Sequence, residues 1–162
     1  MTPRQCEIAA ESYAACLLAQ AGYDVLVQYG PNQPNYDLVA SKGSQFLPIS
    51  VKGSQDGGWM LAVKYVQLCK DYHEAIDMWL EAQRKDIIFL FVQFRDVKMG
   101  TAPRAYIARA PEIAVHMKTQ CHGRGHGSLQ EDYRRYHPKS KYDHCIPTLW
   151  QFTQERLDEI HL

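Results

Sequence analysis

The sequence lacks the features that mark secreted and membrane proteins. No uninterrupted apolar stretch approaches the length of a membrane-spanning helix. The N-terminal residues carry Arg4, Glu7 and Glu11 among the apolar ones, a pattern that fits neither a secretory nor a transit leader. We therefore expect a cytoplasmic protein that has no membrane partner.

A cysteine framework and an excess of charge of one sign are lacking as well. The 5 cysteines are odd in number and none is spaced as CxxC, so neither a disulfide scaffold nor a zinc ribbon is indicated, and we expect buried free thiols. Lys and Arg total 18, as do Asp and Glu, so the net charge does not point to a nucleic-acid partner. Function must be sought in local patterns.

What the sequence does contain is an alternation of helical and extended patterns. Without a repeat or an internal boundary, we expect a single domain over residues 1–162. The helices predicted from spacing and caps lie at about 3–21, 72–85 and 111–118, and a terminal helix closes the chain. The predicted caps are Asp71 for the second helix and Thr153 for the terminal one. The predicted strands lie within 23–29, 35–40 and 46–52, which we expect to form a meander, and within 86–94 and 104–110. This order predicts an α/β domain with a mixed sheet.

Two further segments are harder to assign from pattern alone. Residues 59–66 fit either a strand or the start of a helix. Residues 119–144 are rich in Gly, His and basic side chains and are predicted to be one long loop.

Two of the predicted strands each carry a charged residue, although a strand that served only the core would have neither. Side chains alternate between the two faces of a strand, so Ser50 and Lys52 share one face, opposite Ile49 and Val51. If the two strands are neighbours, Asp37 of the earlier strand meets Lys52 near one end of the sheet.

The first helix supplies a third polar group. At about 100° per residue, Glu11 lies within the apolar arc defined by Ile8 and Leu18. A carboxylate on a packing face needs a charged partner or a cation. Two interpretations follow: a buried ion pair between Lys52 and Asp37 or Glu11, or a carboxylate site suited to Mg²⁺.

The order of these residues resembles the core of the PD-(D/E)XK nuclease superfamily, in the style of Holliday-junction resolvases and related restriction-type endonucleases. The resemblance rests on AESYAACLLAQAGYDV, NYDLVA and ISVKGS, within residues 10–54. It implies a restriction-endonuclease-like mixed central β-sheet flanked by α-helices. It also implies an endonuclease that hydrolyses DNA, in which Glu11 and Asp37 bind Mg²⁺ or Mn²⁺ and Lys52 is catalytic.

The sequence departs from the superfamily pattern at two places. Asn35 and Tyr36 precede Asp37 where proline often stands, a change that keeps the carboxylate. Ser50 stands where the superfamily usually has Glu, Asp or Gln, and a neutral hydroxyl is a weaker ligand. We count Ser50 as a site residue and expect weaker metal binding. The alternative function is a non-catalytic domain of the same fold that binds nucleic acid or a protein partner.

The expected DNA contacts lie downstream of the lysine. Basic residues outnumber acidic ones between 104 and 142 and alternate with Tyr and His, a pattern suited to a phosphate backbone and unpaired bases. The candidates are Gln55, Arg124, Arg134, Arg135 and Lys139. The other interpretations are an ordinary solvated loop and, for Gln55, a turn residue.

Two expectations concern zinc and assembly. Zinc is not expected at 121–137, because CHxxxH lacks the second half of a structural site. Cutting both strands of a duplex would favour a homodimer with two sites.

Overall fold

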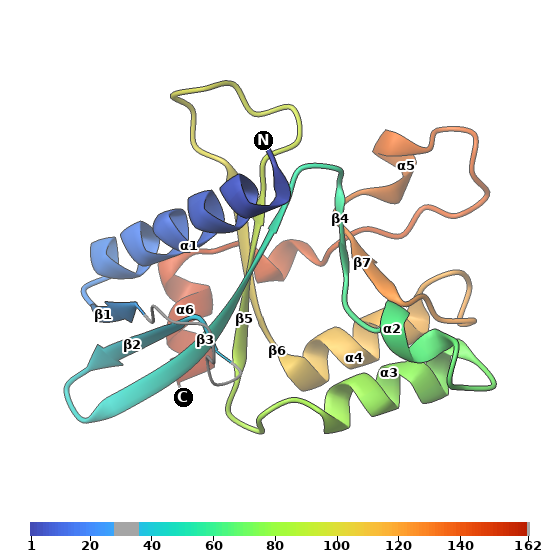
Figure 1. The fold of residues 1–162 in the computed structure, drawn as a ribbon, viewed down its shortest axis with the longest axis horizontal. Coiled ribbons are helices and arrows are strands. Elements are labelled where there is room, and N and C mark those ends of the chain that lie inside the picture. The colour runs from blue at the N-terminus through green and yellow to red at the C-terminus, as the bar shows by residue number, and fades with distance from the viewer. Residues whose placement is uncertain (28–35, 162) are drawn as a thin grey trace.

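The computed structural model describes residues 1–27 and 36–161, and within these ranges the protein is built around one mixed β-sheet (Figure 1). The sheet has five strands in the order β1-β2-β3-β5-β6. Their bounds are Asp24–Val27 for β1, Leu38–Lys42 for β2, Gln45–Ser54 for β3, Ile88–Gln93 for β5 and Arg104–Arg109 for β6. The first three strands form the expected antiparallel meander, β3 and β5 are parallel, and β6 is antiparallel to β5.

Helices and a small second sheet surround this sheet. The helices are α1 Pro3–Gln20, α2 Val63–Val66, α3 Tyr72–Glu81, α4 Ala110–Thr119, α5 Tyr133–Tyr136 and α6 Gln154–His161, with a 3₁₀ turn at Thr148–Trp150. The second sheet pairs β4 Gly58–Met60 with β7 Ser128–Gln130. The protein is therefore an α/β protein with a mixed five-stranded sheet and flanking helices. None of the described helices has the length and apolarity needed to cross a membrane.

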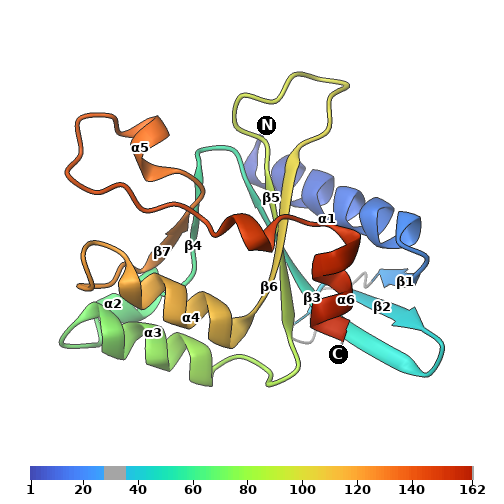
Figure 2. The same cartoon turned by 180° about the vertical axis from the view of Figure 1, so that it is seen from behind.

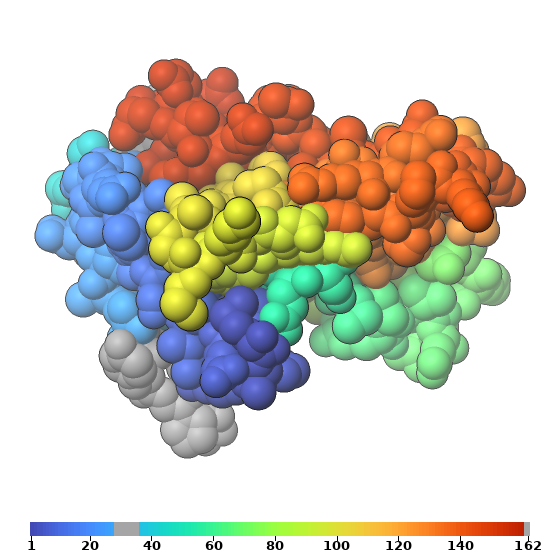
Figure 3. Space-filling view, turned by 90° about the horizontal axis from the view of Figure 1, so that it is seen from above, coloured from blue at the N-terminus to red at the C-terminus, as the bar shows by residue number. Residues whose placement is uncertain are grey.

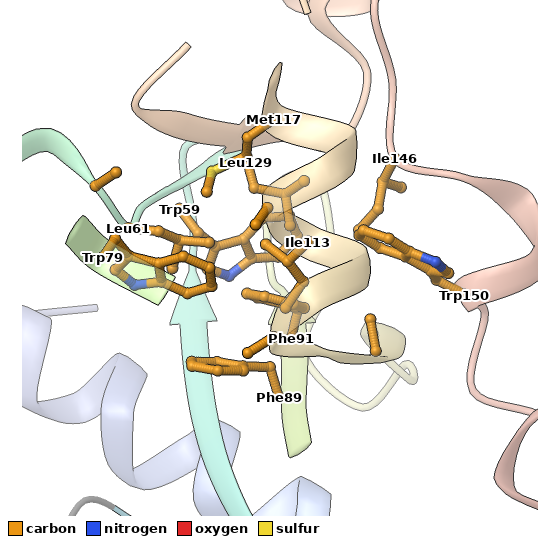
Figure 4. Close-up of a cluster of buried hydrophobic side chains, with 14 of the residues drawn as sticks. Trp59, Leu61, Trp79, Phe89, Phe91, Ile113, Met117, Leu129, Ile146 and Trp150 are labelled. Atoms are coloured by element: carbon orange, nitrogen blue, oxygen red, sulfur yellow. The ribbon is translucent and has the colours of Figure 1, made fainter. Parts of the chain in front are cut away.

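Each face of the central sheet is covered by a separate hydrophobic core. On one face, α1 and α6 pack on alternate residues of β5, with α6 seen best from behind (Figure 2). On the other face, α3 and α4 enclose an aromatic cluster that includes Trp59, Trp79, Phe89 and Phe91 (Figure 4). Every residue of β5 is buried, as expected for a continuous apolar run with helices on both sides.

The packing face of α1 differs from the predicted one. Ile8 is 48% exposed, and the buried residues are Cys6, Ala10, Ala14 and Leu18. The reason is close approach to β3: a Cβ added at Gly53 would lie 2.9 Å from the Cβ of Ala10. Only a row of small side chains lets the helix come this near, so the small residues face the sheet. Glu11 lies beside that row and is half-buried.

Several other predictions need correction. Residues 59–66 divide into the end of β4 and α2, and α3 ends at Glu81, earlier than expected. Residues 119–144 are not one loop, because they contain β7, which pairs with β4, and α5. All five cysteines are free, but only Cys6 and Cys121 are buried. The last residues of the predicted first strand, 28 and 29, lie outside the described ranges.

The helix caps agree with their predictions. Asp71 accepts a hydrogen bond from the Glu74 N–H at 2.9 Å, and Thr153 accepts one from the Arg156 N–H at 3.2 Å. Each satisfies a backbone donor that the first turn of a helix leaves without a partner.

Candidate functional site

The candidate site lies where β2 and β3 separate. Their pairing ends at Leu38 and Ile49, and the Asp37 N–H adds one more hydrogen bond, to the Ile49 carbonyl, at 2.8 Å. Beyond this point β3 continues to Ser54 while paired on its other side with β5. In the described chain, this stretch of β3 therefore has one edge that no strand of the sheet covers.

Asp37 occupies the fork between the two strands. Its Oδ2 accepts hydrogen bonds from the Val51 N–H at 2.6 Å and from the Ser50 hydroxyl at 3.2 Å. The carboxylate thus accepts the hydrogen bond from the Val51 N–H that a carbonyl of a neighbouring strand would otherwise accept. No described residue donates a hydrogen bond to Oδ1.

Ser50 and Lys52 project from β3 on the same side, as the alternation predicts. Ser50 is buried, and its hydroxyl is committed to Asp37. The backbone carbonyl of Lys52 accepts a hydrogen bond from the Trp59 indole N–H at 2.8 Å, which ties β4 to β3 at this residue. The ion pairs of the described chain involve other residues, so the ion-pair interpretation of Lys52 finds no support.

Glu11 reaches the same neighbourhood from α1. Burial raises its pKa, and the negative charges of Asp37 and Glu7 raise it further, against smaller opposing effects of Arg4 and Lys52. The Asp37 carboxylate and the Lys52 ammonium are thus near enough to act on the charge of Glu11, with opposite signs. The tertiary structure therefore brings Glu11, Asp37 and Lys52 together.

The donor set is small for a metal ion. In residues 1–27 and 36–161, no group of three or more His, Cys, Asp or Glu side chains is placed to hold a metal ion. This applies to Glu11 and Asp37 and also to the residues considered for zinc, Cys121, His122, His126 and His137. Two carboxylates suit Mg²⁺, which keeps several waters and takes its remaining ligands from a bound phosphate.

Two cavities meet at Lys52. The first, of about 330 Å³, is lined by Tyr36, Asp37, Ser50, Lys52, Met60, Leu61, Lys64, Tyr65, Trp79, Ala82, Gln83 and Phe89. The second, of about 380 Å³, extends from Lys52 toward the start of α1. Lys52, Met60 and Leu61 line both. Lys52 thus lies where the two cavities adjoin.

Sequence reasoning missed the residues on the far wall of the first cavity. Lys64 and Tyr65 lie on α2, within the segment whose pattern fitted either a strand or a helix. A Lys-Tyr pair in such a short segment carries no signal of a site. Only the pairing of β4 with β7 places it opposite Lys52.

The predicted DNA contacts are divided by the fold. Gln55 lines the second cavity, and its amide donates to the Met1 carbonyl at 2.7 Å. Arg124, Arg134, Arg135 and Lys139 line neither cavity. From above, the orange segment that contains α5 lies apart from the dark-blue start of α1, with the yellow-green connection after β5 between them (Figure 3).

Two of these arginines have partners within the protein. Arg124 lies over the rings of Tyr72 and Tyr142, at 5.4 and 5.6 Å from their centroids. Arg135 pairs with Asp96 at 3.4 Å. Their role in binding DNA stays a prediction.

Comparison with known proteins adds no relative to this geometry. No protein-family model matches the chain, and no curated protein matches it. A functional conclusion therefore rests on the residues and their arrangement.

Proposed function

We propose that the protein is a metal-dependent endonuclease that hydrolyses DNA phosphodiester bonds on a restriction-endonuclease-like fold. The observation that carries the proposal is the placement of Asp37 and Lys52 at the uncovered edge of β3, beside a cavity, with Glu11 of α1 near enough to feel both charges. The order of elements supports it: a helix, three antiparallel strands and, after β4 and the two helices α2 and α3, a strand parallel to the third.

Each residue has a distinct role in this proposal. Glu11 and Asp37 hold Mg²⁺ or Mn²⁺, which supplies charge neutralisation at the phosphate and an activated water. The ammonium of Lys52 stabilises negative charge on the phosphate and orients the attacking water. Ser50 holds the Asp37 carboxylate in place through its hydroxyl.

Cleavage of a mixed DNA panel tests the proposal. Labelled plasmid, linear, branched and single-stranded DNA are incubated with Mg²⁺, Mn²⁺ or EDTA. We expect cutting that requires metal, is lost in Asp37→Asn, and falls on the order of 10²–10³-fold in Lys52→Ala. The control is Lys98→Ala, which removes an exposed lysine that lines neither cavity. Full metal-dependent cutting by Lys52→Ala would overturn the mechanism.

The second candidate is a non-catalytic domain of this fold that binds nucleic acid or a protein partner. It is favoured by Ser50, which replaces a ligand and already donates a hydrogen bond to Asp37 Oδ2. This function predicts that Mg²⁺ leaves the thermal midpoint unchanged and that Asp37→Asn binds DNA as well as the wild type does. Thermal melts with and without Mg²⁺ separate the two candidates, because only a bound ion stabilises the folded state.

A further inference from the structure

The first cavity has two walls of different chemistry. One wall is the candidate site, with Asp37, Ser50 and Lys52. The other is formed by α2 and the end of α3, and it presents aromatic rings and amine and amide groups. Its members are Lys64, Tyr65, Trp79 and Gln83, and Tyr36 closes the side next to Asp37.

The wall that carries Lys64 and Tyr65 is held in place by the second sheet. The N–H groups of Leu61 and Ala62 both donate to the Gly127 carbonyl, at 3.2 and 2.9 Å. β4 pairs with β7 on one side and is tied to β3 by the Trp59 indole on the other. The width of the cavity is therefore fixed by hydrogen bonds rather than by the short helix alone.

Two of the tyrosine rings that line the cavity each have a cation over them. Lys64 Nζ lies 4.8 Å from the centroid of the Tyr65 ring, and the Arg84 guanidinium lies 5.6 Å from that of Tyr36. Lys64 is exposed and Tyr65 is half-buried. Grooves that bind single-stranded nucleic acid combine positive charge for the backbone with aromatic faces for the bases.

Charge distinguishes the two cavities. Of the described residues that line the first cavity, Asp37 is the only carboxylate, against Lys52 and Lys64. The second cavity has Glu7 and Asp56 beside Lys52. A phosphate backbone is therefore attracted to the first cavity and repelled by the second.

The volume of the first cavity limits what can enter it. About 330 Å³ is at the lower end of the range for small-ligand sites, roughly 300–1,000 Å³, and offers no room for a base pair. A base within a duplex reaches such a cavity only after it has left its stack and its partner, at a cost of about a few kcal/mol. An unpaired nucleotide avoids most of this cost.

We propose that the cavity between Lys52 and Tyr65 receives one unpaired nucleotide, stacked on Tyr65 with its phosphate between Lys52 and Lys64. The substrates are then single-stranded or branched DNA rather than intact duplex. This proposal deepens the proposed endonuclease function and rests on it for cleavage, whereas binding of the nucleotide does not require hydrolysis.

Equilibrium binding in EDTA tests the cavity without cleavage. The probes are a labelled single-stranded oligonucleotide, the same strand with one abasic position moved along it, and a blunt duplex. We expect the wild type to bind the single strand best and to lose affinity at one abasic position. Tyr65→Ala should bind roughly tenfold more weakly and become insensitive to the abasic position, while Tyr65→Phe stays close to wild type.

Lys64→Ala gives an independent measurement at an exposed residue. Loss of one phosphate contact should lower the slope of log affinity against log salt by about one, and Lys98→Ala should leave the slope unchanged. Thermal melts establish that Lys64→Ala and Lys98→Ala are folded. Equal affinity for duplex and single strand, or a Tyr65→Ala variant that binds like wild type, would overturn the proposal.

The outcomes distinguish the nucleotide-cavity proposal from the endonuclease proposal on which it rests. If no DNA is cut but Tyr65→Ala weakens single-strand binding, the endonuclease proposal fails and the nucleotide cavity is retained. If wild type and Tyr65→Ala cut intact duplex equally well, the cavity proposal fails and the endonuclease proposal is retained.

Discussion

At the scale of single residues, Glu11 and Glu131 show two outcomes for a carboxylate removed from water. Glu131 is 5% exposed and accepts hydrogen bonds from Arg104, Tyr106 and Tyr136. Burial alone would raise its pKa, but these donors outweigh it and hold the pKa below its ordinary value. No described residue donates to Glu11, and its pKa is raised. Glu131 therefore has the partners of a structural residue, whereas the described chain supplies no hydrogen-bond donor to Glu11.

Replacing Glu11 by Gln tests this difference. The variant should melt no lower than wild type in metal-free buffer, because it removes a charge that Asp37 and Glu7 disfavour. Wild type should gain about 2.7 kcal/mol of stability at a Mg²⁺ concentration 100 times its Kd, and Glu11→Gln much less at that concentration. Calorimetry with and without Mg²⁺ measures both, with the exposed Glu155→Gln as control. Equal stabilisation of all three proteins would show that no ion binds at Glu11.

His144 gives the protein a defined sensitivity to acid. Burial lowers its pKa to about 4, and the neighbouring His126, His116 and His122 add to this effect against Asp143. Neither ring nitrogen has a hydrogen-bond partner in the described chain. The unfolded state then binds a proton more readily than the folded state does, so stability falls as the pH drops from 6.5 toward 4.

The variant His144→Phe checks this sign. Its ring can keep the stack on Tyr133, where the centroids are 4.6 Å apart, but it does not titrate. We expect the free energy of unfolding to fall less between pH 6.5 and 4 than in wild type. Urea titrations at several pH values measure the difference, and superimposable pH profiles would contradict the prediction.

At the scale of elements, the contact between α1 and β3 positions the candidate site. The helix crosses the strand at Gly53, one residue after Lys52, and an added Cβ there would also lie 2.9 Å from the Cys6 carbonyl oxygen. The backbone cannot move aside without shifting α1. The absence of a side chain at Gly53 thus sets the distance of Glu11 from the strand that carries Lys52.

The variant Gly53→Ala should lower the free energy of unfolding by about 1–3 kcal/mol, the usual cost of overpacking. Adding Ala10→Gly removes the 2.9 Å contact between Cβ atoms but leaves the one with the Cys6 oxygen. Gly53→Ala should therefore cost less stability in the Ala10→Gly background than in the wild type, but it should still cost some. A double-mutant cycle in urea measures the coupling. Strictly additive effects would mean that the helix and strand do not touch at this point.

At the scale of the whole molecule, the chain after α4 folds back to complete the wall of the cavity. β7 pairs with β4, and Glu131, the next residue but one after Leu129, anchors the segment to β6 through Arg104. The cavity that Lys52 lines therefore depends on residues far downstream of Asp37 and Lys52.

Removing the charge of Glu131 should loosen this arrangement. Glu131→Gln leaves the Arg104 guanidinium without its carboxylate, and breaking a buried pair costs about 3–5 kcal/mol. We expect urea titrations to show a loss of this order in the free energy of unfolding. Amide exchange should be accelerated more in β7 than in β5. The exposed pair of Arg84 and Asp86 provides the comparison, since Asp86→Asn should cost under about 1 kcal/mol. Similar losses in both variants would contradict the anchoring role.

The local elements were largely determined by the sequence itself. The continuous apolar run of β5, the caps at Asp71 and Thr153 and the meander are encoded in neighbouring residues, because periodicity and capping act over one or two turns. The order of Glu11, Asp37 and Lys52 was likewise visible in the sequence.

The tertiary structure alone decided how those elements meet. The face of α1 against the sheet follows from Gly53, which permits only small residues there, and not from the position of Ile8. The wall bearing Tyr65 depends on two strands of three residues each, too short to show a pattern, which pair across a long stretch of chain. Local sequence determines which residues can form strands, but a pairing between distant segments is selected by the packing of the whole molecule.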